Sequence, residues 1–160
     1  MMPRVLSLAT LGTALGCGLI AGAFFVFSTF VMKALATLPP AQAIRAMQAL
    51  NIAAPTGLFL ATLLGTALAC GALAVQAMLG WSQPGAALRL GGALAYLLSA
   101  FGVTVVANVP RNDALAALDP GAVNAATEWM RYLSEWTAWN HVRTVAALIA
   151  AALLTVSRPG

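Results

Sequence analysis

The side chains that could do chemistry are concentrated in one stretch of the chain, from Phe101 to Thr144. All four carboxylates, three of the four tryptophans and the single histidine lie there, while the rest of the chain is nearly uninterrupted hydrocarbon with small residues. Imidazole titrates near neutral pH and acts as a general base, and a guanidinium group orients an anionic oxygen. The stretch therefore has the residue types for removing a proton and holding the resulting anion.

Four residues of this stretch are the candidate catalytic residues. They are Asn108, Asn140, His141 and Arg143. Arg143 either orients an anionic oxygen or forms a structural ion pair with Glu135 or Asp113. His141 is either a general base or a packing residue near the membrane surface. Asn108 either donates a hydrogen bond to a ligand carbonyl or ends a helix.

A helical wheel at 100° per residue arranges the residues near the end of this stretch. Trp136, Trp139 and Arg143 share one face, and Asn140 borders it. His141 points to nearly the opposite side if the helix is continuous, so it is not automatically part of the Trp/Arg face.

Six further residues are the candidate substrate-binding residues. They are Phe25, Ser28, Asn112, Tyr132, Trp136 and Trp139. Phe25 and Ser28 lie in a run with four phenylalanines, which either packs against lipid and other helices or forms a wall of an aromatic ligand pocket. The tryptophans either form an aromatic belt at the membrane interface or stack on a planar ligand. Asn112 has the same two interpretations as Asn108.

The composition of the chain is that of a membrane protein. Hydrophobic residues make up 61% of the 160 residues and charged residues 8%, whereas average chains carry about 25% charged residues. The net charge of +4 comes from seven arginines and one lysine, which are scattered and flank apolar segments. This pattern predicts contact with membrane lipid and no nucleic acid partner.

The apolar segments predict an all-α fold, a single domain over residues 1–160 that is a bundle of four transmembrane helices. The spanning helices are expected at about residues 5–35, 51–79, 87–109 and 123–156. A short amphipathic helix over residues 41–50 is expected to lie at the membrane surface after the first span. Pro39 and Pro40 break the chain before it, and Pro110 is expected to end the third span.

The last helix carries the strongest pointer to a functional site. Its uncharged part, residues 144–157, covers about 21 Å at 1.5 Å per residue, against a hydrocarbon core of about 30 Å. The span must therefore reach back to roughly Thr137, which places Asn140, His141 and Arg143 inside the membrane region. Polar groups there are costly and need partners.

Connectivity brings polar and aromatic residues of all four spans to one end of the bundle. Ser28, Asn51, Asn108 and Arg143 are all expected at the end away from the two termini. We expect the functional site at that end. The positive charges favour cytoplasmic termini.

No metal centre is predicted, because the chain has one histidine and two separated cysteines. Cys17 and Cys70 are interpreted as small buried residues, with a disulfide or a thiol relay as the alternative. Glycines four residues apart, such as Gly12 and Gly16, suit close helix packing within one bundle or between two chains. A homo-oligomer therefore remains an open expectation.

Three blocks of the sequence resemble the DUF1772 family, also called the anthrone oxygenase family. They are AGAFFVFSTFVMKAL (Ala21–Leu35), FGVTVVANVPRNDALAAL (Phe101–Leu118) and WTAWNHVRT (Trp136–Thr144). The resemblance implies a four-helix integral membrane protein. Fungal relatives oxidise polyketide anthrones to anthraquinones with molecular oxygen and no evident cofactor, and most bacterial members have no assigned activity.

If that activity carries over, a base removes a proton from an electron-rich tricyclic ketone or phenol, and the anion reacts with oxygen to give a quinone. The resemblance then implies the following roles. His141 is the base, Asn108, Asn140 and Arg143 hold the anion, and Trp136, Trp139 and Phe25 form an apolar slot. The competing hypothesis is a non-enzymatic membrane protein, either lipophile-binding or an accessory subunit. A quinone- or haem-dependent redox subunit is a third, but it needs axial ligands that a single histidine does not supply.

Overall fold

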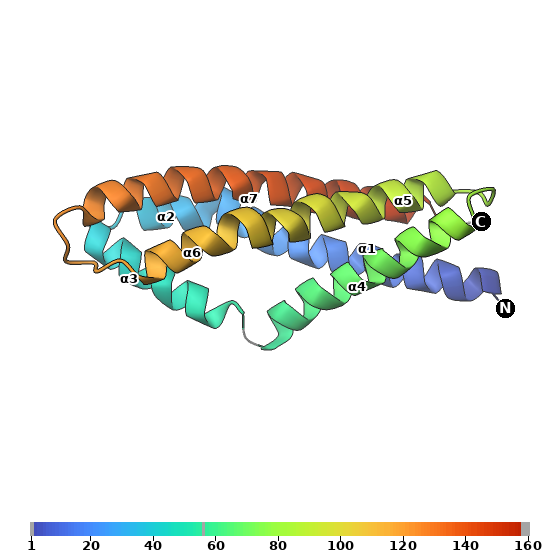
Figure 1. The fold of residues 1–160 in the computed structure, drawn as a ribbon, viewed down its shortest axis with the longest axis horizontal. Coiled ribbons are helices and arrows are strands. Elements are labelled where there is room, and N and C mark those ends of the chain that lie inside the picture. The colour runs from blue at the N-terminus through green and yellow to red at the C-terminus, as the bar shows by residue number, and fades with distance from the viewer. Residues whose placement is uncertain (1, 56, 158–160) are drawn as a thin grey trace.

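The computed structural model describes residues 2–55 and 57–157 as helices joined by short loops (Figure 1). Four of the helices are long and apolar enough to cross a membrane. They lie side by side as a bundle, which confirms the predicted all-α four-helix fold. The first described helix begins and the last one ends at the same end of the bundle (Figure 1).

The first span is one continuous rod. It comprises α1 (Met2–Val26), the π-helical turn η1 (Phe27–Val31) and α2 (Met32–Ala36). After a short turn, α3 (Pro40–Ala53) leads into the second span, α4 (Gly57–Leu79). In Figure 1, α3 and α4 meet at an apex that stands off from the other helices.

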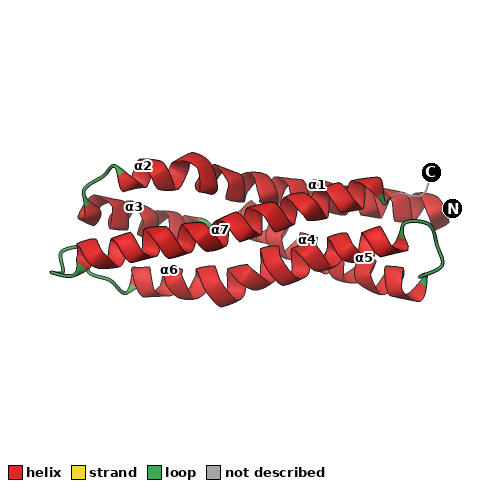
Figure 2. Cartoon of the chain, turned by 90° about the horizontal axis from the view of Figure 1, so that it is seen from above, coloured by secondary structure: helices red, strands yellow, loops and turns green. Residues whose placement is uncertain are grey.

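The third span is also a composite rod. It comprises α5 (Ala86–Leu94), two π-helical turns, η2 (Ala95–Phe101) and η3 (Thr104–Asn108), and α6 (Val109–Ala116). The last span is a single helix, α7 (Ala125–Val156). Viewed from above, α7 lies between the first and third rods (Figure 2), and it packs against both.

Three of the four spans are longer than a membrane requires. These three spans have 31 to 33 residues, whereas α4 has 23. At 1.5 Å per residue, the three long spans exceed the roughly 30 Å hydrocarbon core by about 15 Å or more. The excess lies at the end away from the termini, where α3 packs against the other rods. A separate apolar cluster fills this extension. Its members include Met32, Ile44, Met47, Leu115, Trp129, Tyr132 and Trp136.

The prediction that Pro110 ends the third span is wrong, because the rod continues to Ala116. The backbone changes to π geometry just before the proline, with the Val109 N–H donating to the Thr104 carbonyl. Pro110 then falls in the first turn of a new α-helical segment, where a missing N–H is tolerated.

The second span begins at Gly57 rather than near Asn51. Asn51 belongs to α3, whose chain turns away at Ala54 and Pro55. Gly57 follows with φ of +60°, a backbone conformation that glycine adopts without strain. The predicted surface helix is therefore longer than expected, and its apolar face is buried against the neighbouring rods.

The first rod and α4 approach each other closely at two neighbouring positions. A Cβ atom on Gly16 would collide with the Thr66 hydroxyl, so this glycine is needed for the contact. The sulfur atoms of Cys17 and Cys70 are in hydrogen-bonding contact at 3.9 Å, and both residues are fully buried free cysteines. Gly12, by contrast, has nothing within 4 Å of an added Cβ.

Candidate functional site

An apolar pocket of about 420 Å³ lies between the first rod, the junction of α3 with α4, the third rod and α7. This volume is in the usual range of small-molecule sites, about 300–1,000 Å³. Each of the three π-helical turns contributes to the lining: η1 supplies Phe27, η2 supplies Phe101, and η3 supplies Thr104 and Val105. Such turns occur frequently at functional sites, and here they face one cavity.

Most of the pocket wall is aromatic or aliphatic, and its polar lining residues are few. The apolar lining includes Phe24, Phe27, Phe59, Leu60, Leu63 and Phe101. The polar lining consists of Asn51, Thr104, Asn112, Asp113, Trp136 and Arg143. A flat hydrophobic molecule with one or two polar groups would match this distribution.

The Arg143 guanidinium is the buried cation of the pocket. Its side chain is only 4% exposed, and it lies between two rings, 4.2 Å from the centroid of Phe24 and 5.1 Å from that of Trp136. Nη1 donates to the Thr104 hydroxyl at 3.1 Å and Nη2 to Asn140 Oδ1 at 2.6 Å. These contacts hold the planar group against two aromatic rings and through two of its five N–H groups.

The ion pair considered for Arg143 does not form among the described residues. Glu135 pairs with Arg111 instead, at 2.9 Å, and Asp113 takes part in no ion pair within the described part of the chain. The Nε of Arg143 is buried and has no hydrogen-bond partner there. A buried cation without a counter-charge is costly, and this arrangement favours the binding of an anionic oxygen.

Asn140 fixes Arg143 to the first rod. Its Nδ2 donates to the Phe24 carbonyl and to the Ser28 hydroxyl, each at 2.7 Å. The Thr144 hydroxyl donates to the Asn140 carbonyl, so the 3.1 Å contact between Ser28 and Thr144 uses the Ser28 proton. Both Asn140 and Ser28 are buried and do not line the pocket, so they position the guanidinium rather than contact a ligand.

Asn112 connects the pocket to the aromatic cluster of the extension. Its Oδ1 accepts from the Trp136 indole N–H at 2.8 Å and from the Tyr132 hydroxyl at 2.9 Å. The Tyr132 hydroxyl in turn accepts from Asn51 at 3.4 Å. These bonds fix the orientation of the Asn112 amide, whose Nδ2 has no bonded partner among the described residues.

Asn108 ties the third rod to α7 at the level of the pocket. It is 1% exposed, and its Nδ2 donates to the Trp136 carbonyl at 3.2 Å. Its Oδ1 is buried without a partner in the described structure. Because Asn108 does not line the pocket, its contacts are those of a positioning residue.

Three of the predicted site residues are exposed and lie away from the pocket. Phe25 is 52% exposed and Trp139 is 39% exposed, and both point away from the bundle core. His141 is also exposed, on the opposite side of α7 from Arg143, as the helical wheel indicated. None of the three lines the cavity.

The family model described as anthrone oxygenase matches residues 55–153, more than half of the chain. The chain belongs to the anthrone oxygenase family. No curated protein and no solved structure gives a significant match. In this family member the matched region supplies α4, the third rod and α7, and thus Thr104, Asn112 and Arg143. The first rod and α3, which contribute Phe24 and Asn51, lie before the matched region.

Sequence reasoning missed two residues that contact the Arg143 side chain, Thr104 and Phe24. Thr104 precedes Asn108 and Asn112 by four and eight residues, a spacing that places the three residues on one face of a helix. This spacing could have predicted Thr104 as a site residue. Phe24 and its neighbour Phe25 could not be told apart, because almost every position around α1 is apolar. The structure assigns the inward place to Phe24.

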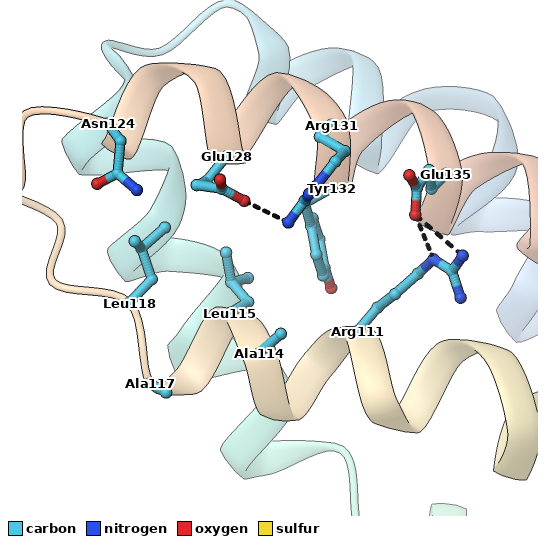
Figure 3. Close-up of a pocket in the computed structure, with 10 residues that line it drawn as sticks. All are labelled: Arg111, Ala114, Leu115, Ala117, Leu118, Asn124, Glu128, Arg131, Tyr132 and Glu135. Atoms are coloured by element: carbon cyan, nitrogen blue, oxygen red, sulfur yellow. Dashed lines mark hydrogen bonds and ion pairs between the residues drawn. The ribbon is translucent and has the colours of Figure 1, made fainter.

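A second pocket, of about 430 Å³, lies in the extension between α6 and the start of α7 (Figure 3). Its charged groups are paired with one another. Arg111 pairs with Glu135 at 2.9 Å and Arg131 with Glu128 at 2.6 Å. The ring of Tyr132 also faces this pocket (Figure 3). Because its cations are already neutralised, this pocket is a weaker anion site than the one at Arg143.

The pocket at Arg143 can hold a flat apolar molecule and stabilise negative charge on one of its oxygens. A fixed cation in a water-poor site stabilises a developing oxyanion more strongly than it would in water. Among the described residues, no three histidine, cysteine, aspartate or glutamate side chains gather as a metal site would require.

Proposed function

We propose that this protein is an oxygenase that oxidises an anthrone-like polycyclic aromatic with molecular oxygen to a quinone, without a bound cofactor. The observation that carries the proposal is the unpaired cation of Arg143 at the wall of an otherwise apolar pocket. Membership of the anthrone oxygenase family supports the same reaction class.

The reaction suits the geometry of the pocket. Loss of a proton from the reactive CH₂ group of an anthrone leaves an anion whose charge rests largely on the oxygen of the former ketone. Arg143 would hold that oxygen, and the aromatic walls would hold the rings. The anion gives one electron to oxygen, the two radicals combine, and the resulting hydroperoxide loses water. One oxygen atom enters the quinone and the other leaves as water.

Oxygen uptake by the detergent-purified protein with an anthrone as substrate tests this proposal. We expect uptake above the spontaneous rate together with quinone absorbance. Arg143→Ala should lower the rate by at least about 100-fold, the usual effect of removing one oxyanion donor. Arg131→Ala is the matched control, because it removes an exposed arginine outside the pocket. Arg143→Lys keeps the buried charge in case the alanine variant does not fold.

Absence of uptake by the folded wild-type protein would overturn the oxygenase proposal. Quenching of the tryptophan fluorescence by an added anthraquinone, in a protein without turnover, would then favour the alternative of a lipophile-binding membrane protein. The partners that remain predictions are membrane lipid, a hydrophobic aromatic ligand and a second copy of the chain. The cytoplasmic location of the termini is likewise a prediction, which labelling of a cysteine introduced near Arg4 in intact cells would test.

A further inference from the structure

The pocket at Arg143 contains one side chain that can accept a proton. Of the residues that line it, only Asp113 and Arg143 are ionisable. Arg143 holds the oxyanion as a protonated guanidinium in the proposed reaction, so it is not the base. Carboxylates act as general bases on C–H bonds that a carbonyl group activates. Asp113 therefore has the chemistry that the first step of the reaction needs.

The other carboxylates of the described chain are engaged elsewhere. Glu128 pairs with Arg131, Glu135 pairs with Arg111, and Asp119 Oδ1 accepts from a backbone N–H. Among the described residues Asp113 alone has a carboxylate with neither an ion pair nor a hydrogen bond. Asp113 lines the pocket and is also exposed, so its lone pairs are available to a bound molecule.

The position of Asp113 along the third rod also suits this role. Thr104, which holds Arg143, precedes it by nine residues on the same rod. In an anthrone the carbonyl oxygen and the reactive CH₂ group lie across the central ring from each other. A base and an oxyanion-binding group must therefore stand on opposite sides of the central ring of the ligand. Asp113 and Arg143 line the same pocket from such separated positions on different helices.

We propose that Asp113 is the catalytic base, which takes a proton from the reactive CH₂ group of an anthrone whose carbonyl oxygen rests against Arg143. The C–H bond breaks, an O–H bond forms on the Asp113 carboxylate, and the electron pair moves through the ring to the carbonyl oxygen. This inference rests on the proposed oxygenase function. His141, which does not line the pocket, has no part in the step.

Hydrogen exchange without oxygen isolates this proton transfer. Under argon in deuterated buffer, wild-type protein should accelerate deuterium incorporation into the CH₂ group of an anthrone, followed by mass spectrometry. Asp113→Asn should lower this acceleration by about 100-fold or more, the usual contribution of a general base. Glu128→Gln is the matched control, since it neutralises a carboxylate that lies outside the pocket at Arg143. It should exchange like the wild type.

Two further measurements separate catalysis from folding. Anthraquinone binding, followed by quenching of the tryptophan fluorescence, should be unchanged in Asp113→Asn. Added formate should partly restore exchange in Asp113→Ala, which a purely structural role would not allow. Full exchange and turnover in Asp113→Asn would overturn the inference about the base. Loss of exchange in His141→Ala, with exchange retained in Asp113→Asn, would overturn it as well. Either result would leave the oxygenase proposal standing. A wild-type protein with neither exchange nor turnover would instead overturn the proposed function.

Discussion

Arg143 Nη2 donates a 2.6 Å hydrogen bond to Asn140 Oδ1, and Asn140 is itself hydrogen-bonded to the first rod. Both Nδ2 protons of Asn140 are donated there, to the Phe24 carbonyl and to the Ser28 hydroxyl. A single buried amide thus holds the pocket cation and joins two spans. The orientation of the guanidinium depends on this residue.

Asn140→Ala should lower both stability and turnover. It removes three hydrogen bonds, one of them to a charged group, and we expect a loss of roughly 3 kcal/mol in the free energy of unfolding. Turnover per folded molecule should fall at least about 10-fold, because the oxyanion donor is no longer held in place. Thermal unfolding in detergent and oxygen uptake measure the two effects. Asn124→Ala, at an exposed asparagine, is the control, and unchanged turnover in Asn140→Ala would contradict the positioning role.

Phe24→Ala and Phe25→Ala should differ strongly although the residues are adjacent. Phe24 is 4% exposed and its ring lies 4.2 Å from the Arg143 guanidinium, whereas Phe25 is 52% exposed. Loss of the buried ring should cost about 3 kcal/mol of stability and lower turnover. Loss of the exposed one should change each by little. Equal effects of the two substitutions in the same unfolding and uptake assays would show that the ring against Arg143 is unimportant.

The fold could be predicted from the sequence because long apolar segments in a chain with few charges form transmembrane helices, which pack together as a bundle. The limits of the third span could not be predicted, because Pro110 is a strong helix terminator by itself. The rod continues through the π-helical turn η3 before the proline, and Asn108 of that turn donates a hydrogen bond to the Trp136 carbonyl of α7. Local sequence does not encode that contact.

The site could be predicted in part, for a physical reason. Arg143 and Asn140 were identified because a polar group at membrane depth needs partners, and the structure gives them those partners. Phe25 was chosen over Phe24 because a span surrounded by lipid has no polar face to show which side is inward. The pairing of Glu135 with Arg111 depends on how α6 approaches α7, which the sequence does not show.

Gly16→Ala should loosen the contact between the first rod and α4. The added methyl group would collide with the Thr66 hydroxyl and approach its methyl group to 3.3 Å. Because Thr66 is buried and β-branched, it can move little, so we expect a loss of about 1–3 kcal/mol. Gly12→Ala, one helical turn earlier, meets nothing within 4 Å and should be neutral in thermal unfolding. A stable Gly16→Ala protein would mean that the two helices can separate without cost.

Arg89→Met should separate stability from activity, because Arg89 is a buried arginine at the opposite end of the bundle. Its side chain is 0% exposed and donates to Gln76, to the Pro84 carbonyl and to the Ser157 carbonyl, at 3.1 to 3.2 Å. It thereby joins α4, the following loop and the end of α7. Methionine cannot replace these bonds, so we expect a loss of roughly 3 kcal/mol and a lower unfolding temperature.

Turnover per folded molecule should nevertheless stay at the wild-type level in Arg89→Met, since neither Arg89 nor its partners line the pocket at Arg143. Oxygen uptake, normalised to the folded fraction from size-exclusion chromatography, measures this. Arg4→Met, at an exposed arginine near the same end, controls for the change in charge. A loss of turnover in Arg89→Met as large as that in Arg143→Ala would mean that the effect of either arginine reflects folding alone, and that Arg143 has no separate role in the chemistry.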